Sequence, residues 1–368
     1  MFWTIFPQYD STLYEKYPER NTGIDQMLEL SKFAINSKAD DGVYWDSTTN
    51  SRIVIKFDLR DISSSIVTGK IPKSTKYYLK LYTATNTDLP IDYNIYAYPL
   101  AQSWENGNGH LNDLPEIKTG ISWKYRGGMP PTEWNSGSGI EMSWQSSKGG
   151  ASYHTSSLYV CSQSFNYESP DVRMDITKMV KGWLSGSISN NGLILKRSNL
   201  DESGSSIFGR VKYFSKDTHT IFLPRMELLW NDTVLSGISN FQEIGEDYTI
   251  HVKNVKPAYN TKSRTRIRIG SRDRYPIKTY STSSNYRLNK RLPTSSYYSI
   301  LDYATGDTII PFDSIGTKIS CDSEGNYFDL RMDCLFPERY YSGIIKVERN
   351  GGNTVDILDN YFIFKVTR

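Results

Sequence analysis

The sequence is poor in the residues that most often build catalytic and metal sites. It contains three cysteines, Cys161, Cys321 and Cys334, and four histidines in 368 residues. No cysteines form a CxxC pair and the histidines are widely spaced, so the ligand spacings of zinc sites are absent. We interpret the cysteines as buried thiols in a reducing compartment, with a Cys321–Cys334 bridge between neighbouring strands as the alternative.

Recognisable catalytic motifs are also missing. The chain has no GxSxG nucleophile motif, and no cysteine lies in the sequence context of a cysteine protease. The glycine-rich pieces at 107–109 and 149–150 lack the Lys-Ser/Thr of a phosphate-binding loop. Carboxylate pairs such as Asp201 and Glu202 do occur, but a glycosidase needs two carboxylates across a cleft, which adjacent positions do not establish. We therefore expect no enzymatic activity, no cofactor and no metal.

Long hydrophobic runs are absent as well. No stretch approaches the roughly 20 apolar residues that cross a bilayer. Residues 1–20 contain no basic region followed by an uninterrupted apolar segment, so we predict no signal peptide. These features predict a soluble protein without a membrane partner. The net charge of +3 is small for this length and excludes little.

Aromatic residues are abundant instead, with 27 Tyr, 14 Phe and 8 Trp. Combined with many Thr, Ser, Asn and Gly residues, this composition is typical of an all-β protein with many turns. The segment 52–59 alternates, with Ile53 and Ile55 on one face and Arg52 and Lys56 on the other, which predicts a half-buried strand. The length favours two domains.

One short helix is expected among these strands. Apolar residues recur at i, i+3, i+4 and i+7 from Ile176 to Trp183, and Asp175 precedes them as an N-cap. Gly186 is a helix stop signal, and a turn at 190–192 leads into a short apolar strand. An amphipathic helix of two to three turns is not stable alone in water. We expect it to close one end or face of a β-sandwich.

The last third of the chain predicts a second, smaller sandwich. We expect domain boundaries at 1–234 and 247–368, with residues 235–246 as a linker. Six segments alternate or run apolar at strand length, and residues 302–307 have hairpin-turn chemistry. The expected strands are 248–255, 264–269, 297–303, 326–332, 341–347 and 361–366. About 120 residues is the size of an immunoglobulin-like domain.

Several sequence blocks in residues 8–231 resemble the DNRLRE-type domain. These blocks are Asn-Thr-Gly at 21–23, RIVIKFDL at 52–59, DITKMVKGWLSG at 175–186, NNGLILK at 190–196 and LPRMEL at 223–228. The resemblance implies a jelly-roll-like β-sandwich related to carbohydrate-binding modules. The chain departs from the family at Ser122-Trp123-Lys124 and Pro130-Pro131, inside a long insertion, where the family has Thr-Trp-Asn-x-x-Pro.

The C-terminal sequence resembles structural proteins of tailed-phage virions, for instance at IPFD, 310–313, and GTKISCD, 316–322. Together the two resemblances imply a virion component of the tail, collar or neck, or baseplate. Such a component is assembled in the host bacterial cytoplasm, in a symmetric ring with copies of itself and other virion proteins. The alternative is a carbohydrate-binding protein that recognises host surface glycans.

Two sets of residues are candidate binding sites. The first is an aromatic loop set, whose rings can stack on sugars, anchor a subunit contact or pack internally. We favour subunit contact, with internal packing of about half the set as the alternative. The set comprises Trp104, Trp123, Tyr125, Trp134 and Trp144.

The second set lies in residues 251–300, which hold 12 Lys or Arg against Asp273 alone. Arg264, Arg266 and Arg268 recur at period two and so share one strand face. We rank a solvated face first, commonly at a strand edge, docking to an acidic patch of another virion subunit second, and nucleic acid third.

Overall fold

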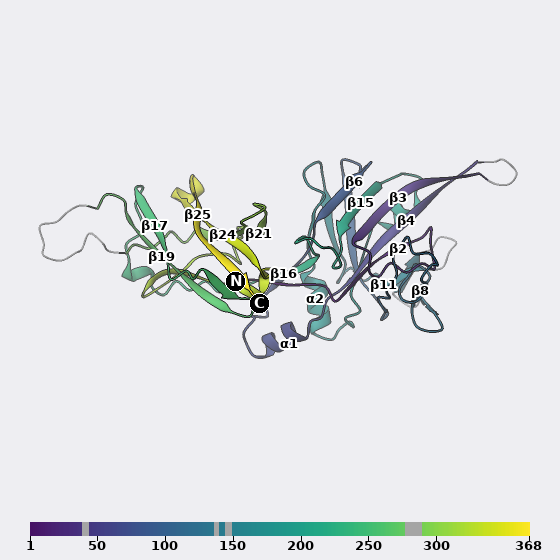
Figure 1. Cartoon of the computed structure of the whole chain (residues 1–368), viewed down its shortest axis with the longest axis horizontal. Helices are drawn as coiled ribbons and strands as arrows, with labels where there is room; N and C mark the ends of the chain where they lie inside the picture. Colours follow the sequence, from purple (N-terminus) through teal and green to yellow (C-terminus); the bar gives the residue numbers. More distant parts are fainter. Residues whose placement is uncertain (39–43, 136–139, 144–148, 277–288) are drawn as a thin grey trace, which may run out of the picture. The chain divides into compact units, whose positions relative to one another are not determined.

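The computed structural model describes residues 1–38, 44–135, 140–143, 149–276 and 289–368 and confirms an all-β fold (Figure 1). In these residues, no helix is long and apolar enough to span a membrane. The chain divides into two compact units, residues 5–227 (the N-terminal unit) and residues 1–4 with 228–368 (the C-terminal unit).

This division differs from the expected domain boundaries. Residues 1–4 group with the C-terminal unit, where the Trp230 amide donates to the Met1 carbonyl at 3.2 Å. The segment expected as a linker is hydrogen-bonded to the same unit. The Cys321 amide donates to Val234 and the Gly237 amide to Cys321, at 2.8 and 3.1 Å. A linker was expected because this segment has no strand periodicity, but its backbone is paired nonetheless.

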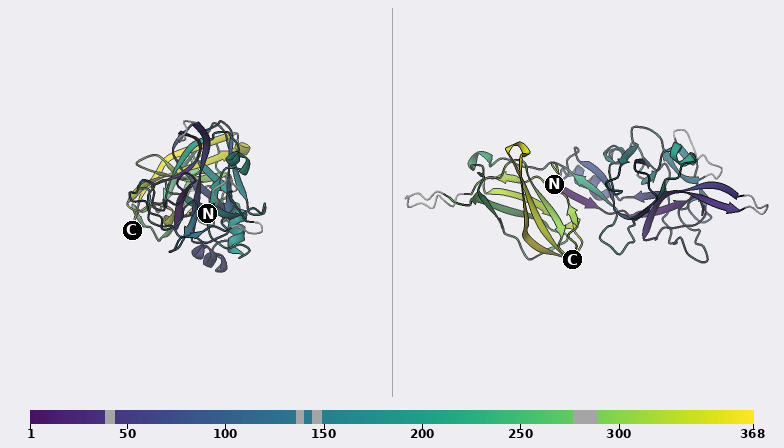
Figure 2. Two further views of the ribbon diagram at one scale, coloured as in Figure 1. Left: turned by 90° about the vertical axis from the view of Figure 1, so that its right-hand side faces the viewer. Right: turned by 90° about the horizontal axis from the view of Figure 1, so that it is seen from above.

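The N-terminal unit contains an eight-stranded sheet in the order β12-β7-β14-β4-β3-β15-β6, with β2 also paired to β4. β3 and β4 form a long antiparallel hairpin, drawn in purple in Figures 1 and 2. A four-stranded sheet in the order β1-β16-β5-β13 contains β5 and β13 of this unit, together with β1 and β16, which lie at the division between the units. The bounds in the first sheet are β2 Tyr9–Tyr14, β3 Met27–Lys38, β4 Tyr44–Lys56, β6 Thr83–Thr87, β7 Tyr93–Pro99, β12 Cys161–Phe165, β14 Leu193–Lys196 and β15 Gly209–Phe214. Those in the second are β1 Phe2–Ile5, β5 Lys76–Leu81, β13 Val172–Asp175 and β16 Arg225–Leu229.

The expected helix is present as α2, Thr177–Leu184. Its apolar stripe from Ile176 to Trp183 is buried, and the Thr177 amide donates to Asp175 Oδ1 at 2.9 Å. The prediction of a single helix was wrong, because α1, Arg60–Val67, and α3, Asn199–Ser203, also form. α3, with five residues, is too short to show a helical period, and α1, although as long as α2, buries only Ile62 and so has no buried apolar stripe. α3 does have a local signal, since Ser198 caps it by accepting from the Asp201 amide at 3.0 Å.

The strand predicted at 52–59 is buried on both faces rather than half-buried. Ile53, Val54 and Ile55 are all fully buried, and Arg52 is 1% exposed. The reason is that residues 100–135 and 149–154 (the covering segment) pack on Val54 and Ile194 of the eight-stranded sheet and build a second core there. Among the described residues between 100 and 154, the strands are β8 Tyr125–Gly127, β9 Thr132–Glu133, β10 Ile140–Ser143 and β11 Gly149–His154.

The C-terminal unit is a sandwich of two sheets, β17-β19-β23-β22 and β18-β25-β24-β20-β21. Phe328 of β23 stacks on Tyr298 of β20 with ring centroids 4.1 Å apart, so the sheets pack face to face. All six expected strands form. Their bounds, with the other elements, are β17 Tyr248–Lys253, β18 Ala258–Asn260, β19 Arg264–Asp273, β20 Ser296–Asp302, β21 Thr308–Ile310, β22 Ser320–Asp322, β23 Gly325–Arg331, β24 Arg339–Arg349 and β25 Thr354–Thr367, with short 3₁₀ turns at Ile238–Asn240, Met332–Cys334 and Asn350–Gly352.

The three cysteines are free and buried. The alternative of a Cys321–Cys334 bridge was therefore wrong. Burial raises the pKa of the Cys161 thiol to about 11 and that of Cys334 to about 12. The thiols accordingly behave as small apolar side chains rather than as nucleophiles.

Candidate functional site

The tryptophans of the aromatic loop set are part of the second core. Trp104, Trp123 and Trp134 are 5%, 0% and 4% exposed. The indole N–H of Trp104 donates to the Asn191 carbonyl at 2.8 Å, and that of Trp134 to the Ser122 carbonyl at 3.2 Å. These three rings offer no face to a sugar or another subunit, so their assignment as a binding platform was wrong and internal packing is correct.

The other two members of the set differ. Tyr125 is half-buried, and its hydroxyl donates to Glu19 Oε1 at 3.2 Å. Trp144 lies outside the described residues. Tyr125, the only one of these two that is described, does not supply the exposed platform that glycan stacking requires.

Asn21, in the loop between β2 and β3, binds the covering segment through three side-chain hydrogen bonds. Its side-chain amide donates to the carbonyls of Asn106 and Ile121 at 2.8 and 2.7 Å, and its Oδ1 accepts from the Gly109 amide at 2.7 Å. Gly107, at φ +76°, lies so close that a Cβ there would be 2.5 Å from Asn21 Oδ1. The Asn-Thr-Gly block is thus explained by packing.

A charged cluster lies beneath the same covering segment. Arg52 Nη2 contacts Glu202 Oε2 at 2.6 Å, and Lys196 Nζ contacts the same oxygen at 3.0 Å. These side chains are only 2%, 7% and 0% exposed. Burial opposes the charge of Arg52, but Glu202 offsets this and raises the Arg52 pKa. The cluster is shut off from solvent, so it acts in stability rather than in chemistry.

The arginine row has partners within the chain. Arg264 and Arg266 bind Asp329 at 3.0 and 2.9 Å, and Arg268 binds Asp322 at 2.6 Å. The hydrogen bond from Arg268 holds the pKa of Asp322 below its usual value. β19 lies between β17 and β23, so the row is not at a strand edge, but Arg264 and Arg266, 57% and 45% exposed, do lie on a solvated face. The shared face is confirmed, but its charge is matched by carboxylates of β22 and β23.

Unmatched cations lie one strand away, beside β17. Lys253, Arg272 and Arg274 are exposed and make no ion pair with any described residue. Thr249 of β17 pairs with Arg272 of β19, and His251 with Gly270. The ring of His251 lies over Gly270, where a Cβ would come within 2.3 Å of it. Among the described residues of the basic segment, these three cations lie around β17, while Lys256 and Lys262, also exposed and without an ion pair, lie beyond its end.

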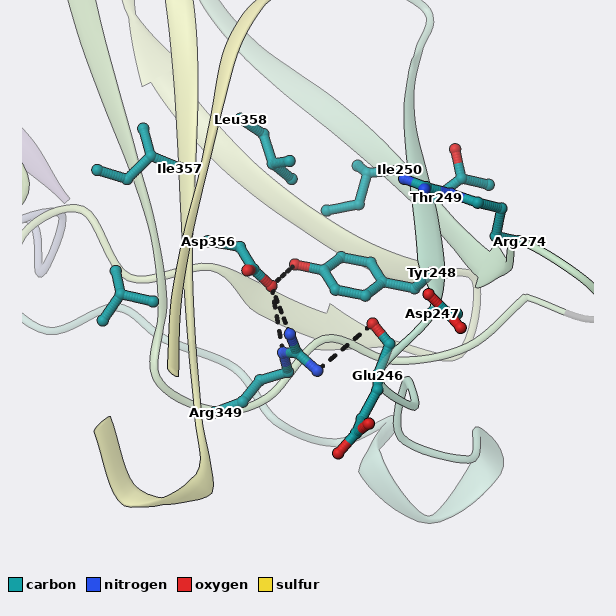
Figure 3. A pocket seen from close by; sticks show the side chains of 11 residues that line it. Glu246, Asp247, Tyr248, Thr249, Ile250, Arg274, Arg349, Asp356, Ile357 and Leu358 are labelled. Atoms are coloured by element: carbon teal, nitrogen blue, oxygen red, sulfur yellow. Dashed lines mark hydrogen bonds and ion pairs between the residues drawn. The ribbon is translucent and has the colours of Figure 1, made fainter. Parts of the chain in front are cut away.

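A cleft of about 430 Å³ opens between β17 and the first half of β25 (Figure 3). Tyr248 and Arg349 converge on Asp356 from two elements, as Figure 3 shows. The Tyr248 hydroxyl donates to Asp356 Oδ2 at 2.6 Å, and Arg349 Nη2 donates to the same oxygen at 2.9 Å. The aliphatic side chains of Ile250 and Leu358 also line the cleft. Most of its lining is nevertheless polar or charged, because Glu246, Asp247, Thr249 and Arg274 line it as well.

Both strands that flank this cleft have an unpaired edge. Among the described residues, β17 pairs only with β19, and β18 covers β25 only at residues 365–367. Val355 and Ile357 of β25 are 48% and 57% exposed. Free backbone N–H and C=O groups beside a cleft are the requirement for binding an extended chain by strand addition. The unpaired edges of β17 and β25, with the cleft between them, are the candidate site.

Sequence reasoning missed the cleft. Tyr248 and Asp356 are 108 residues apart, and no local motif connects them. In the described part of the chain, no three His, Cys, Asp or Glu side chains are grouped to hold a metal ion.

No protein-family model matches the chain, and a search of curated proteins finds no match.

Proposed function

We propose that the protein is a non-enzymatic structural component of a tailed-phage virion, in the tail, collar or neck, or baseplate, that acts through contacts between subunits. The observation that carries the assembly role is the pair of unpaired edges on β17 and β25 beside the cleft. The virion assignment is supported by the resemblances of the two sequence regions.

The side chains at the free edge of β25 favour association. Soluble proteins usually protect long strand edges with lysine, proline or a bulge, because a bare edge recruits other strands. Residues 354–359 of β25, TVDILD, contain neither lysine nor proline, and the exposed Val355 and Ile357 add apolar area. The carboxylate in the cleft, Asp356, is already held by Tyr248 and Arg349, which supports binding rather than acid–base chemistry.

A glycan-binding role is the second candidate, and one observation favours it. A polar cleft of about 320 Å³ in the N-terminal unit is lined by Lys80, Asn166 and Glu168. Tyr167, between the last two, is 84% exposed. An exposed ring beside amide and charged groups suits a sugar, which offers both an apolar face and hydroxyls. A glycan array with wild type and Tyr167→Ala tests this candidate.

The virion role is tested by mass spectrometry of purified particles from the presumed phage, together with light scattering of the isolated protein. We expect stoichiometric amounts of the chain in particles and assembly beyond a monomer in solution. Absence from particles, combined with a monomer whose array binding depends on Tyr167, would overturn the proposal in favour of glycan recognition.

A further inference from the structure

The free edge of β17 has two chemically different sides. Tyr248 and Ile250 point inward and line the cleft, while His251 and Lys253 are exposed on the outer face. Successive residues of a strand point to opposite faces. A strand added to this edge would therefore place alternate side chains into the cleft and alongside the outer face.

The inner side favours apolar side chains. Ile250 of β17 and Leu358 of β25 line the cleft on the same side as the fixed Asp356 carboxylate, whereas Val355 and Ile357 alternate with Asp356 and point to the other face of β25. Since Asp356 already accepts from Tyr248 and Arg349, a further charge at this depth would have no matched partner. A small aliphatic side chain that enters the cleft would find its apolar contacts at Ile250 and Leu358.

The outer side favours carboxylates. Lys253 and Arg272 make no ion pair among the described residues, and they flank His251 on the outer face. Arg274, at the rim of the cleft, adds a third cation without an ion pair in the same part of the chain. Glu246 and Asp247 precede β17, so the positive stretch extends over residues 249–253 of the edge rather than over its start.

We propose that the β17 edge docks an extended segment of a partner polypeptide in which acidic and apolar residues alternate. The segment adds as a fifth strand to the sheet β17-β19-β23-β22. Its apolar side chains enter the cleft, and its carboxylates face Lys253 and Arg272. This inference rests on the proposed assembly function and names the chemistry of the partner. The acidic partner expected from the sequence is thereby moved from Arg264, Arg266 and Arg268 to the neighbouring strand.

The test measures binding of a synthetic octapeptide, alternating Glu and Val with blocked ends, to the full-length protein by calorimetry. We expect binding that weakens with salt, because the outer contacts are exposed ion pairs. The variant Lys253→Glu/Arg272→Glu should bind at least tenfold more weakly. Lys73→Glu/Lys262→Glu is the matched control, since both lysines are exposed and the change in net charge is the same. It should bind like wild type within about twofold.

Hydrogen exchange locates the peptide independently of affinity. Strand addition should slow exchange of amides in residues 248–253. A peptide alternating Lys and Val should give neither binding nor protection. The proposal is overturned if the Glu–Val peptide does not bind at about 1 mM, if both double variants bind it equally, or if protection appears at β25 instead.

The outcome is separable from that of the virion experiment. If the chain is present in particles but the peptide fails, the docking inference falls and the structural role stands. If the peptide binds as described but particles lack the chain, the virion assignment falls and strand docking remains.

Discussion

The buried cluster of Arg52, Lys196 and Glu202 gives the sharpest prediction on stability. Glu202→Gln keeps the shape of the side chain but leaves two cations in a site where Arg52 and Lys196 are 2% and 0% exposed. Removing one partner of a buried ion pair costs about 3–5 kcal/mol, because the remaining charge is desolvated without compensation. For a unit of this size, such a loss lowers Tm by roughly 6–20 °C.

The assay is urea unfolding followed by circular dichroism, with calorimetry to separate the two units. Glu133→Gln is the matched control, since Glu133 is 56% exposed and its carboxylate lies 3.9 Å from Lys124 Nζ. Its loss should cost less than about 1 kcal/mol. Adding Arg52→Met to Glu202→Gln should cost less than the sum of the single changes. A loss below about 1 kcal/mol for Glu202→Gln would refute the view that Glu202 neutralises this core.

Three further predictions concern other groups. Burial raises the pKa of Asp10 to about 7 in the folded protein, above the value of 3.8 for the unfolded chain. The stabilisation that protonated Asp10 gives is therefore fully present below pH 3.8 and is lost as the pH rises through 7. Between pH 5 and 8, the free energy of unfolding measured with urea should therefore fall by about 3 kcal/mol more in wild type than in Asp10→Asn. An equal fall in both proteins would exclude the raised pKa of Asp10. Asn21→Ala should cost at least about 2 kcal/mol and speed proteolysis of the covering segment, because buried carbonyls lose their donors; unchanged cleavage would contradict its anchoring role. Burial, then Lys253 and Arg272, lower the pKa of His251, so Lys253→Gln/Arg272→Gln should raise it in an NMR titration, and an unchanged value would leave burial as the sole cause.

The sequence predicted those parts of the fold that depend on local periodicity. All six expected strands of the C-terminal unit form, and α2 buries the stripe that its spacing defines. The failure at β4 has a physical cause. A charged residue opposite an apolar face normally indicates solvent, but Arg52 is buried because Glu202, 150 residues away, pairs with it. The covering segment, residues 100–135 and 149–154, has no sequence periodicity to show which surface it packs on.

The same limit applies to the candidate site. Composition identified residues 251–300 as basic, and period two placed Arg264, Arg266 and Arg268 on one face, as found. The sequence does not show which of these cations lack an ion pair, because that depends on the carboxylates of neighbouring strands. Carboxylates of β22 and β23 pair with this row, whereas Lys253 and Arg272 make no ion pair among the described residues. Whether a strand has a free edge likewise depends on the order of strands in the sheet. A docking edge therefore consists of the charges and backbone groups that the chain has not paired within itself. Only the folded arrangement of the strands determines which groups these are.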